Sequence, residues 1–266
     1  MPTLYHAAVG MDRLEQLAAG DSGVHRLHPM AKLLTTAAYV VIVISFPSVN
    51  VSGLTPFLFY PVVLMALSGT PYRPLLGRLA AALPFSLAGG FSNLLLVRTT
   101  AFYVGNIAVS HGAVSCASIL LKTVLTVMAV LLLIATTSFV EIGGQLARLR
   151  MPKIFCLQLI MCYRYISVLL GEAVSMLTAY TLRTRDQQYI QMKDMGSFLG
   201  QLLFRSFDRA ERVYQAMKCR GFQGVYRGKT QSGPGRGDVV YTVLLTAVML
   251  TLRFFNLSRF FGGLAG

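Results

Sequence analysis

The sequence has few charged residues and very few acidic ones. Only 13% of its 266 residues are Asp, Glu, Lys or Arg, and ten of these are acidic. Ordinary soluble domains carry about 25% charged residues, so a water-facing globular surface is not expected. Trp is absent, and the four cysteines lack the C-x-x-C spacing of disulfide or metal pairs. We therefore interpret Cys116, Cys156, Cys162 and Cys219 as small apolar side chains.

The sequence is rich in long apolar runs, and 55% of its residues are hydrophobic. Several runs approach the roughly 20 residues that cross a hydrocarbon layer about 30 Å thick. Because the runs are continuous rather than alternating, they predict helices and argue against a β-barrel. Residues 1–20 contain no apolar region with a small-residue cleavage site, so we expect no removable signal peptide. The predicted fold class is an all-α integral membrane protein.

About five membrane-spanning helices are predicted, four of them within residues 31–144. The third contains Pro84 and the pair Gly89-Gly90, which permits a kink or the close approach of another helix. Lys32 lies at the start of the first run, where its ammonium group is expected to snorkel to the interface. The apolar runs cover residues 30–46, 51–67, 79–97, 116–139 and 238–255.

Basic residues mark one side of the membrane. They precede the first run and follow the second and fourth, whereas the connection between the first two runs has none. Positively charged connections stay in the cytoplasm, so the N-terminus is predicted to be cytoplasmic. This orientation explains the net charge of +14 without a nucleic-acid partner. The marking residues are Arg13, Arg26, Lys32, Arg73, Arg78, Arg148, Arg150 and Lys153.

Residues 145–237 differ from the rest because they hold 15 of the 24 Lys and Arg residues. We predict long amphipathic helices there, in the cytoplasm or at the membrane interface, where anionic lipids would be attracted. Residues 154–180 form an apolar helical pattern interrupted by Arg164 and Glu172, the candidates for an intramembrane ion pair. Residues 198–220 are amphipathic, and Gly221 is expected to cap them. The expected organisation is a cytoplasmic segment (1–30), four membrane helices (31–144), the basic helical region (145–237) and a last membrane helix with the C-terminus (238–266).

Nucleotide and metal sites are not expected. The stretch from Gly224 to Thr230 resembles a phosphate-binding loop, but Gln223 stands where that motif needs glycine. The four histidines share no spacing that would form a compact metal site, and His25 and His28 suit a helix cap or an interface better. We predict no bound cofactor.

Two other classes of membrane protein remain as alternatives. A membrane-embedded enzyme would need a convergent nucleophile, base or metal cluster, and the sequence shows none. A self-sufficient carrier or channel would need polar residues along several spans, where Lys122 and Asn93 form only a thin lining. We therefore expect a non-catalytic protein.

Two arginine clusters lie at the predicted ends of separate helices. They are Arg183-Thr184-Arg185-Asp186 and Lys218-Cys219-Arg220-Gly221. Cations at a helix C-terminus are favoured by the macrodipole, so each cluster could simply cap its helix. Long amphipathic helices with guanidinium tips also suit insertion into grooves of a partner, where arginine binds carboxylates and carbonyls.

Several short motifs together resemble the transmembrane T component of energy-coupling-factor transporters, within the ATP-binding cassette group. The resemblance covers nearly the whole chain. It is carried by residues 22–33 (SGVHRLHPMAKL), 135–138 (ATTS), 149–152 (LRMP), 163–166 (YRYI), 209–212 (RAER) and 216–222 (AMKCRGF).

In that family, two Ala-Arg-Gly-like signatures end the helices that rest on a pair of ATPase subunits. By position the first falls on Thr184, Arg185 and Asp186, with Arg183 beside it, and the second on Cys219, Arg220 and Gly221, with Lys218 beside it. Thr184 and Cys219 replace alanine. Asp186 replaces a small residue and could pair with a neighbouring arginine, so the first signature departs further from the family pattern.

Residues 22–33 resemble the cobalt-type T subunit, often called CbiQ. The resemblance implies a coupling subunit in a bacterial or archaeal plasma membrane, with two ATP-binding cassette ATPases and a separate substrate-binding membrane subunit as partners. The imported substrate would be cobalt or nickel. A T component that serves a vitamin importer is the alternative.

Overall fold

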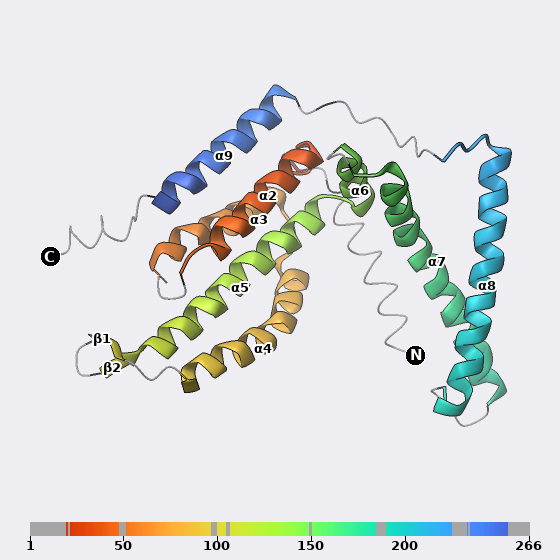
Figure 1. The fold of residues 1–266 in the computed structure, drawn as a ribbon, viewed down its shortest axis with the longest axis horizontal. Helices are drawn as coiled ribbons and strands as arrows, with labels where there is room; N and C mark the ends of the chain where they lie inside the picture. Colours follow the sequence, from red (N-terminus) through yellow and green to blue (C-terminus); the bar gives the residue numbers. More distant parts are fainter. Residues whose placement is uncertain are drawn as a thin grey trace. The chain divides into compact units, whose positions relative to one another are not determined.

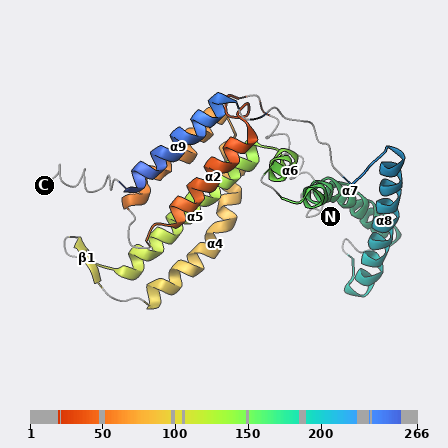
Figure 2. The same ribbon diagram turned by 45° about the horizontal axis from the view of Figure 1, so that its top comes forward.

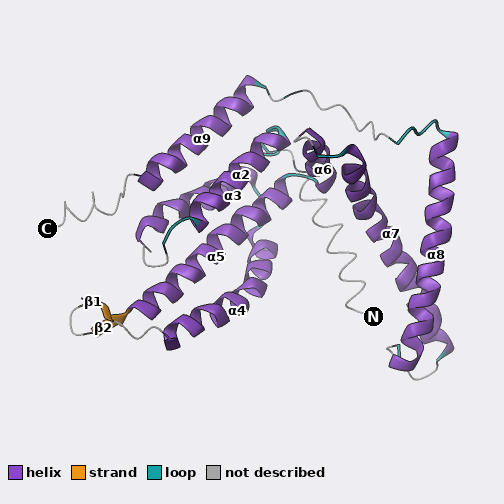
Figure 3. Ribbon diagram, viewed as in Figure 1, coloured by secondary structure: helices purple, strands orange, loops and turns teal. Residues whose placement is uncertain are grey.

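The computed structural model describes residues 20, 22–47, 52–96, 100–104, 107–148, 151–184, 190–224, 233 and 235–254. These residues are almost entirely helical, so the predicted all-α fold is confirmed for them, apart from one short β-hairpin (Figure 3). The chain forms two compact units. We call Leu17–Thr137 with Ser232–Gly266 the bundle unit, and Met1–Gln16 with Ser138–Gln231 the helix-pair unit.

The bundle unit contains most of the predicted membrane helices. Helices α2, α5 and α9 lie side by side in it (Figure 1, Figure 2). Its core gathers Tyr39 and Val43 of α2, Leu54 and Phe57 of the following turn, and Leu125 of α5, all buried. The elements are α2 (Pro29–Ile44), the 3₁₀ helix η1 (Ser52–Leu58), α3 (Phe59–Ser68), α4 (Tyr72–Leu96), β1 (Thr100–Val104), β2 (Ile107–Ser110), α5 (His111–Thr136) and α9 (Arg236–Phe254).

The described parts of the predicted apolar runs are mainly helical, but the run 51–67 is divided between η1 and α3, and the run 116–139 is interrupted after Thr136. Among the described residues, three stretches are long and apolar enough to cross a membrane: Pro74–Leu94, His111–Thr136 and Ile154–Arg183. The last of these contains the apolar pattern predicted over residues 154–180, and it is one continuous helix despite the charged residues Arg164 and Glu172. Helix α2 has only 16 residues, about 24 Å, so its ends need partners inside the apolar layer.

Lys32 of α2 binds the end of α5, and the prediction that it snorkels to the interface is wrong. Its side chain is only 4% exposed. The ammonium Nζ donates to the carbonyl of Thr136 at 2.7 Å and to that of His25 at 3.2 Å. Thr136 is the last residue of α5, where carbonyls have no partner within the helix. Lys32 therefore turns inward because the end of α5 offers it acceptors.

The other end of α2 receives two further cations. Lys122 Nζ of α5 donates to the carbonyl of Phe46 at 2.6 Å. Arg253 of α9 donates to the carbonyl of Ser45 at 2.9 Å and lies over the Phe46 ring at 4.1 Å. Lys122, considered above as part of a thin channel lining, is thus bound to a helix end.

The start of α2 is tied to the start of α9. His28 caps α2 by accepting the Met30 N–H on Nδ1 at 3.1 Å, which confirms the cap predicted for it. The backbone N–H of His28 donates to Asp238 of α9 at 3.0 Å. Together with the contacts of Lys32 and Lys122, this places α2 and α9 parallel and α5 antiparallel to them.

Helix α4 packs closely on α5 through a glycine. It continues through Pro84 and bends along α5 (Figure 1). A Cβ atom at Gly90 would lie 2.6 Å from the Sγ of Cys116, and Asn93 donates to Ser115 at 3.1 Å nearby. Gly90 thus provides the close helix approach that the glycine pair predicts, whereas a Cβ at Gly89 would meet open space.

We predict that Lys32→Met lowers the free energy of unfolding by about 2 kcal/mol or more, because buried carbonyls would lose their donor. The measurement is the midpoint of thermal unfolding in detergent. Lys193→Met is the matched control, since Lys193 is exposed on its helix. Equal midpoints for the two variants would contradict a capping role for Lys32.

We also predict that Gly90→Ala destabilises the bundle unit by about 1–3 kcal/mol, because the new methyl group would overlap Cys116. Adding Cys116→Ala should restore most of that loss by removing the sulfur. The control Gly89→Ala should be neutral or slightly stabilising. If the double variant melts no higher than Gly90→Ala alone, the close approach is not at this position.

Candidate functional site

The helix-pair unit begins with a short helix that anchors a long one. Helix α6 (Phe139–Arg148) starts with a reciprocal cap, in which Ser138 N–H donates to Glu141 and Glu141 N–H donates to the Ser138 hydroxyl. Phe139 stacks on Tyr163 of α7 (Lys153–Arg183) with ring centres 4.4 Å apart. The start of α7 is therefore fixed by packing on α6.

Helix α7 turns back into α8 (Met192–Cys219), and the two run antiparallel. Near the turn, the Tyr180 hydroxyl donates to Asp194 at 2.7 Å. Further along, Arg205 of α8 forms an ion pair with Glu172 of α7. The helices meet near the turn and separate toward the end of α8 (Figure 1, Figure 2).

The predicted ion pair between Arg164 and Glu172 is not formed. Glu172 binds Arg205 instead, and the Arg164 side chain is exposed. The two predicted partners lie on one continuous helix, where eight residues rise about 12 Å. That distance exceeds the reach of a direct contact. Sequence periodicity could show that Arg164 and Glu172 lie near one face of the helix. It could not show that Arg205, 33 positions away from Glu172, would lie closer to it.

An open apolar groove separates α7 from the second half of α8. Its volume is about 650 Å³. None of the described residues of α8 is buried, and Phe204 and Phe207 are well over half exposed. An apolar surface of this kind usually marks a binding site for a partner or membrane. Representative lining residues are Ile154, Leu157, Met161, Val213, Met217 and Phe222.

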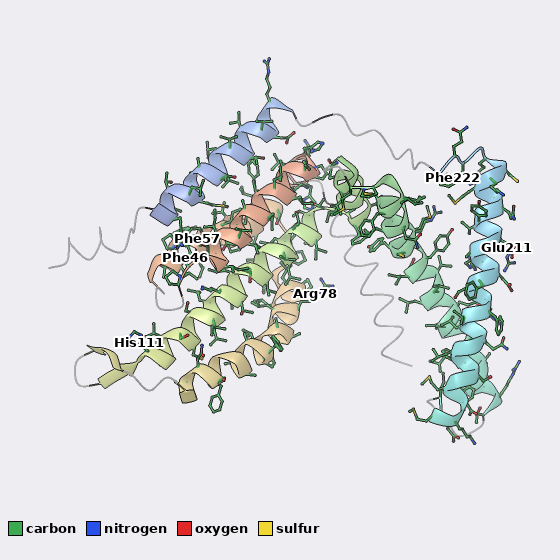
Figure 4. The ribbon with its side chains drawn as sticks, in the orientation of Figure 1. Phe46, Phe57, Arg78, His111, Glu211 and Phe222 are labelled. Carbon is green, nitrogen blue, oxygen red and sulfur yellow. The ribbon has the colours of Figure 1, made fainter. Side chains whose placement is uncertain are left out.

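The end of α8 carries the second signature and is closed by its own backbone. Gly221 adopts a φ of 75°, a left-handed conformation that favours glycine. Its N–H donates to Lys218 at 2.9 Å, and the Phe222 N–H donates to Met217 at 3.0 Å. These two bonds form a Schellman motif, so the predicted glycine cap is confirmed. Figure 4 labels Phe222 at this end of α8.

The signature side chains at this end point to no internal partner. Cys219 and Arg220 are exposed, and the Arg220 guanidinium makes no hydrogen bond or ion pair with another described residue. Lys218 is exposed and lies over the Tyr214 ring, with Nζ 5.1 Å from its centre. Arg220 is therefore available to a partner.

The end of α7 carries part of the first signature. Arg183 is its last residue and is exposed. Thr184 closes the helix, because its hydroxyl donates to the Tyr180 carbonyl at 2.9 Å. Arg185 and Asp186 lie outside the described residues. Because the helices are antiparallel, Arg183 and Thr184 lie at the opposite end of the helix pair from the second signature. Helix α8 has 28 residues and is about 42 Å long.

The described residues offer no obvious metal centre. Among them, no three His, Cys, Asp or Glu side chains group so as to hold an ion. The Ser22 hydroxyl contacts His25 Nδ1 at 2.7 Å, next to the capping His28. These two histidines act in the N-terminal cap of the bundle unit.

Sequence comparisons relate this chain to known transport proteins. The model of the CbiQ family, described as cobalt transport protein, matches residues 20–232. The chain is 27% identical over 254 residues to the "Energy-coupling factor transporter transmembrane protein EcfT" of Bacillus subtilis, covering 88% of this chain and 95% of that protein. Its counterpart in Limosilactobacillus fermentum is 26% identical, with 88% and 94% covered. A "Putative fused cobalt transport protein CbiMQ" of Methanocorpusculum labreanum is 28% identical over 109 residues, 41% of this chain and 18% of that protein.

We predict that Gly221→Ala loosens the end of α8, because an L-residue at this φ costs about 1 kcal/mol. Amide hydrogen exchange of residues 217–222 should become several-fold faster. Gly200→Ala, at a helical position with open space around it, is the control and should not speed exchange there. Unchanged exchange in Gly221→Ala would argue against the Schellman cap.

Proposed function

Because this chain belongs to the CbiQ family of cobalt transport proteins, we propose that it is the transmembrane coupling subunit of an energy-coupling-factor importer for cobalt or nickel. It transmits the motion of two ATP-hydrolysing subunits to a membrane subunit that binds the substrate. The main supporting observation is that two arginine-bearing helix ends lie at opposite ends of one antiparallel helix pair. ATP hydrolysis belongs to the partners, and this chain is non-catalytic.

The first step of coupling is docking of the ATPases on the signature residues. At the end of α8, backbone bonds to Met217 and Lys218 already satisfy helix carbonyls, so Arg220 is not required for capping. An exposed guanidinium can form two parallel hydrogen bonds with a carboxylate or approach carbonyls at a helix end. Arg220 is therefore the principal docking residue at this end, with Cys219 and Gly221 allowing close approach.

The second ATPase docks at the end of α7. Arg183 and Thr184 are placed there, and the family resemblance assigns the central role to Arg185, beside Asp186. Two sites about 42 Å apart are too distant to share one small surface. They suit two copies of an ATPase, one at each end of the helix pair.

The apolar groove between α7 and α8 receives the substrate-binding membrane subunit. An amphipathic or apolar helix binds such a groove through side chains spaced three and four residues apart. A groove of about 650 Å³ without charged residues at its α7 wall suits apolar helix side chains. Membrane lipids surround the remaining apolar faces, and the basic region attracts anionic headgroups.

The packing of the bundle unit supports the proposed orientation. The starts of α2 and α9 lie at the same end as the finish of α5, and the basic region 145–237 follows α5 in the chain. We place this end in the cytoplasm of a bacterial or archaeal cell, because positively charged connections stay there. The N-terminus is then cytoplasmic, and the chain crosses the plasma membrane several times.

The test is co-purification of the tagged chain from native membranes. Arg220→Glu should reduce recovery of the ATPase subunits at least about tenfold, because reversing a paired charge costs several kcal/mol, and cobalt uptake should be lost. Arg212→Glu is the control, since Arg212 is exposed two turns earlier on α8. Combining Arg220→Glu with Arg185→Glu should remove the remaining ATPase.

Either of two results would contradict the proposal. Normal uptake by a well-expressed Arg220→Glu variant would exclude its docking role. Recovery of the folded wild-type chain without any nucleotide-binding partner would favour an autonomous membrane carrier. The companion membrane subunit recovered with wild type would also distinguish cobalt or nickel from a vitamin as the substrate.

A further inference from the structure

We infer that the ion pair between Glu172 and Arg205 is a positioning contact that sets where the Arg220 end of α8 lies relative to α7. The inference rests on the proposed function, because it concerns the geometry of the docking ends. Neither residue belongs to a docking signature. Each acts through the helix that carries one.

The contacts between α7 and α8 are unevenly distributed along their length. Two polar contacts join α7 to α8, from Tyr180 to Asp194 and from Glu172 to Arg205, and both lie in the half nearest the turn. The other half is separated by the apolar groove. The ion pair therefore lies at the edge of the groove, which is lined from Leu169 of α7 and Ser206 of α8 onward.

Apolar packing does not fix the direction of α8 instead. No described residue of α8 is buried, so the helix lacks the interlocked core contacts that normally determine a crossing angle. A directional, charge-assisted bond between Arg205 and Glu172 supplies a defined geometry. The Glu172 side chain is about three quarters shielded from solvent, whereas the Arg205 side chain is about half exposed, so the pair is only partly screened by water and ions.

The distance from this contact to the docking end amplifies small changes. About four helical turns, roughly 22 Å, separate Arg205 from Arg220. A change of roughly 10° in the direction of α8 would therefore move Arg220 by about 4 Å. Displacements of that size exceed the tolerance of a guanidinium–carboxylate bond. The state of the ion pair thus determines whether both ends can engage the ATPases in register.

A spin-label distance measurement on the full chain in detergent tests the positioning directly. Labels attached to Cys162 of α7 and Cys219 of α8, both exposed, report the separation across the groove, in a background with Cys116→Ala and Cys156→Ala. We expect a defined distance in wild type and a shifted or much broader distribution in Arg205→Glu. The charge swap of Arg205→Glu with Glu172→Arg should return the distribution to the wild-type one. An unchanged distribution in Arg205→Glu would overturn the inference.

Transport by the assembled complex provides the functional readout. We expect Arg205→Glu and Glu172→Arg each to lower both the recovery of the ATPase subunits and cobalt uptake at least about fivefold, and the swap to restore both. Arg205→Lys keeps the charge and should retain most uptake, while Arg212→Glu should behave as wild type. If either reversal prevents assembly, Glu172→Gln and Arg205→Gln replace the reversals in the same comparison.

The outcomes separate this inference from the proposed function. If wild type binds ATPases and transports, but both single variants couple normally or the swap fails to rescue them, the positioning role is wrong and the proposed function stands. If wild type binds no ATPase, the proposed function fails first. The distance measurement remains valid in either case, because it needs no partner.

Discussion

The bundle unit depends on satisfying carbonyl groups at helix ends that stop within an apolar environment. Water is not available there to form hydrogen bonds with these carbonyls, and an unpaired polar group in hydrocarbon costs several kcal/mol. Three cations from neighbouring helices meet this need: Lys32 at the end of α5, and Lys122 with Arg253 at the end of α2. Each contact joins two helices and also fixes their relative direction. The same bonds that satisfy carbonyls at the ends of α5 and of the 16-residue helix α2 thus determine the relative directions of α2, α5 and α9.

The two units differ in how their helices are held. In the bundle unit, aromatic packing around Tyr39 and Phe57 and a close contact at Gly90 leave little freedom. In the helix-pair unit, α7 is anchored by α6, while α8 is held by polar bonds near the turn and is otherwise unpacked. A rigid part and a loosely held part are what a subunit needs if it is to stay in the membrane and still transmit motion.

The sequence predicts element type where the signal is local, and end points where a capping residue marks them, whereas α4 and α5 begin seven and five residues before the predicted runs. Apolar runs locate the helices, His28 before Pro29 indicates a cap, and Gly221 indicates the end of α8. The sequence fails where the answer depends on residues far away in the chain. Lys32 turns inward because the end of α5 lies beside it, and Glu172 binds Arg205 because α8 folds back along α7. The predicted pattern over residues 154–180 agrees closely with α7, but the sequence left open whether it forms one helix or two, and the structure shows one helix that continues through Arg164 and Glu172. Arg185 and Asp186 lie outside the described residues, so the first signature remains a prediction from resemblance.

At the end of α8, the residues that close the helix are different from the side chain proposed to bind a partner. Gly221 and the N–H groups that follow it complete the helix without using the side chain of Arg220. Under the proposed docking role, amino-acid changes at position 220 would leave folding almost unaffected and would alter which ATPase binds. A gene encoding this chain could diverge toward a different ATPase through changes at a single codon and its neighbours, while the helix that presents them stays the same. A few mutations would then be enough to change between an ATPase pair that serves several transporters and one that serves this transporter alone.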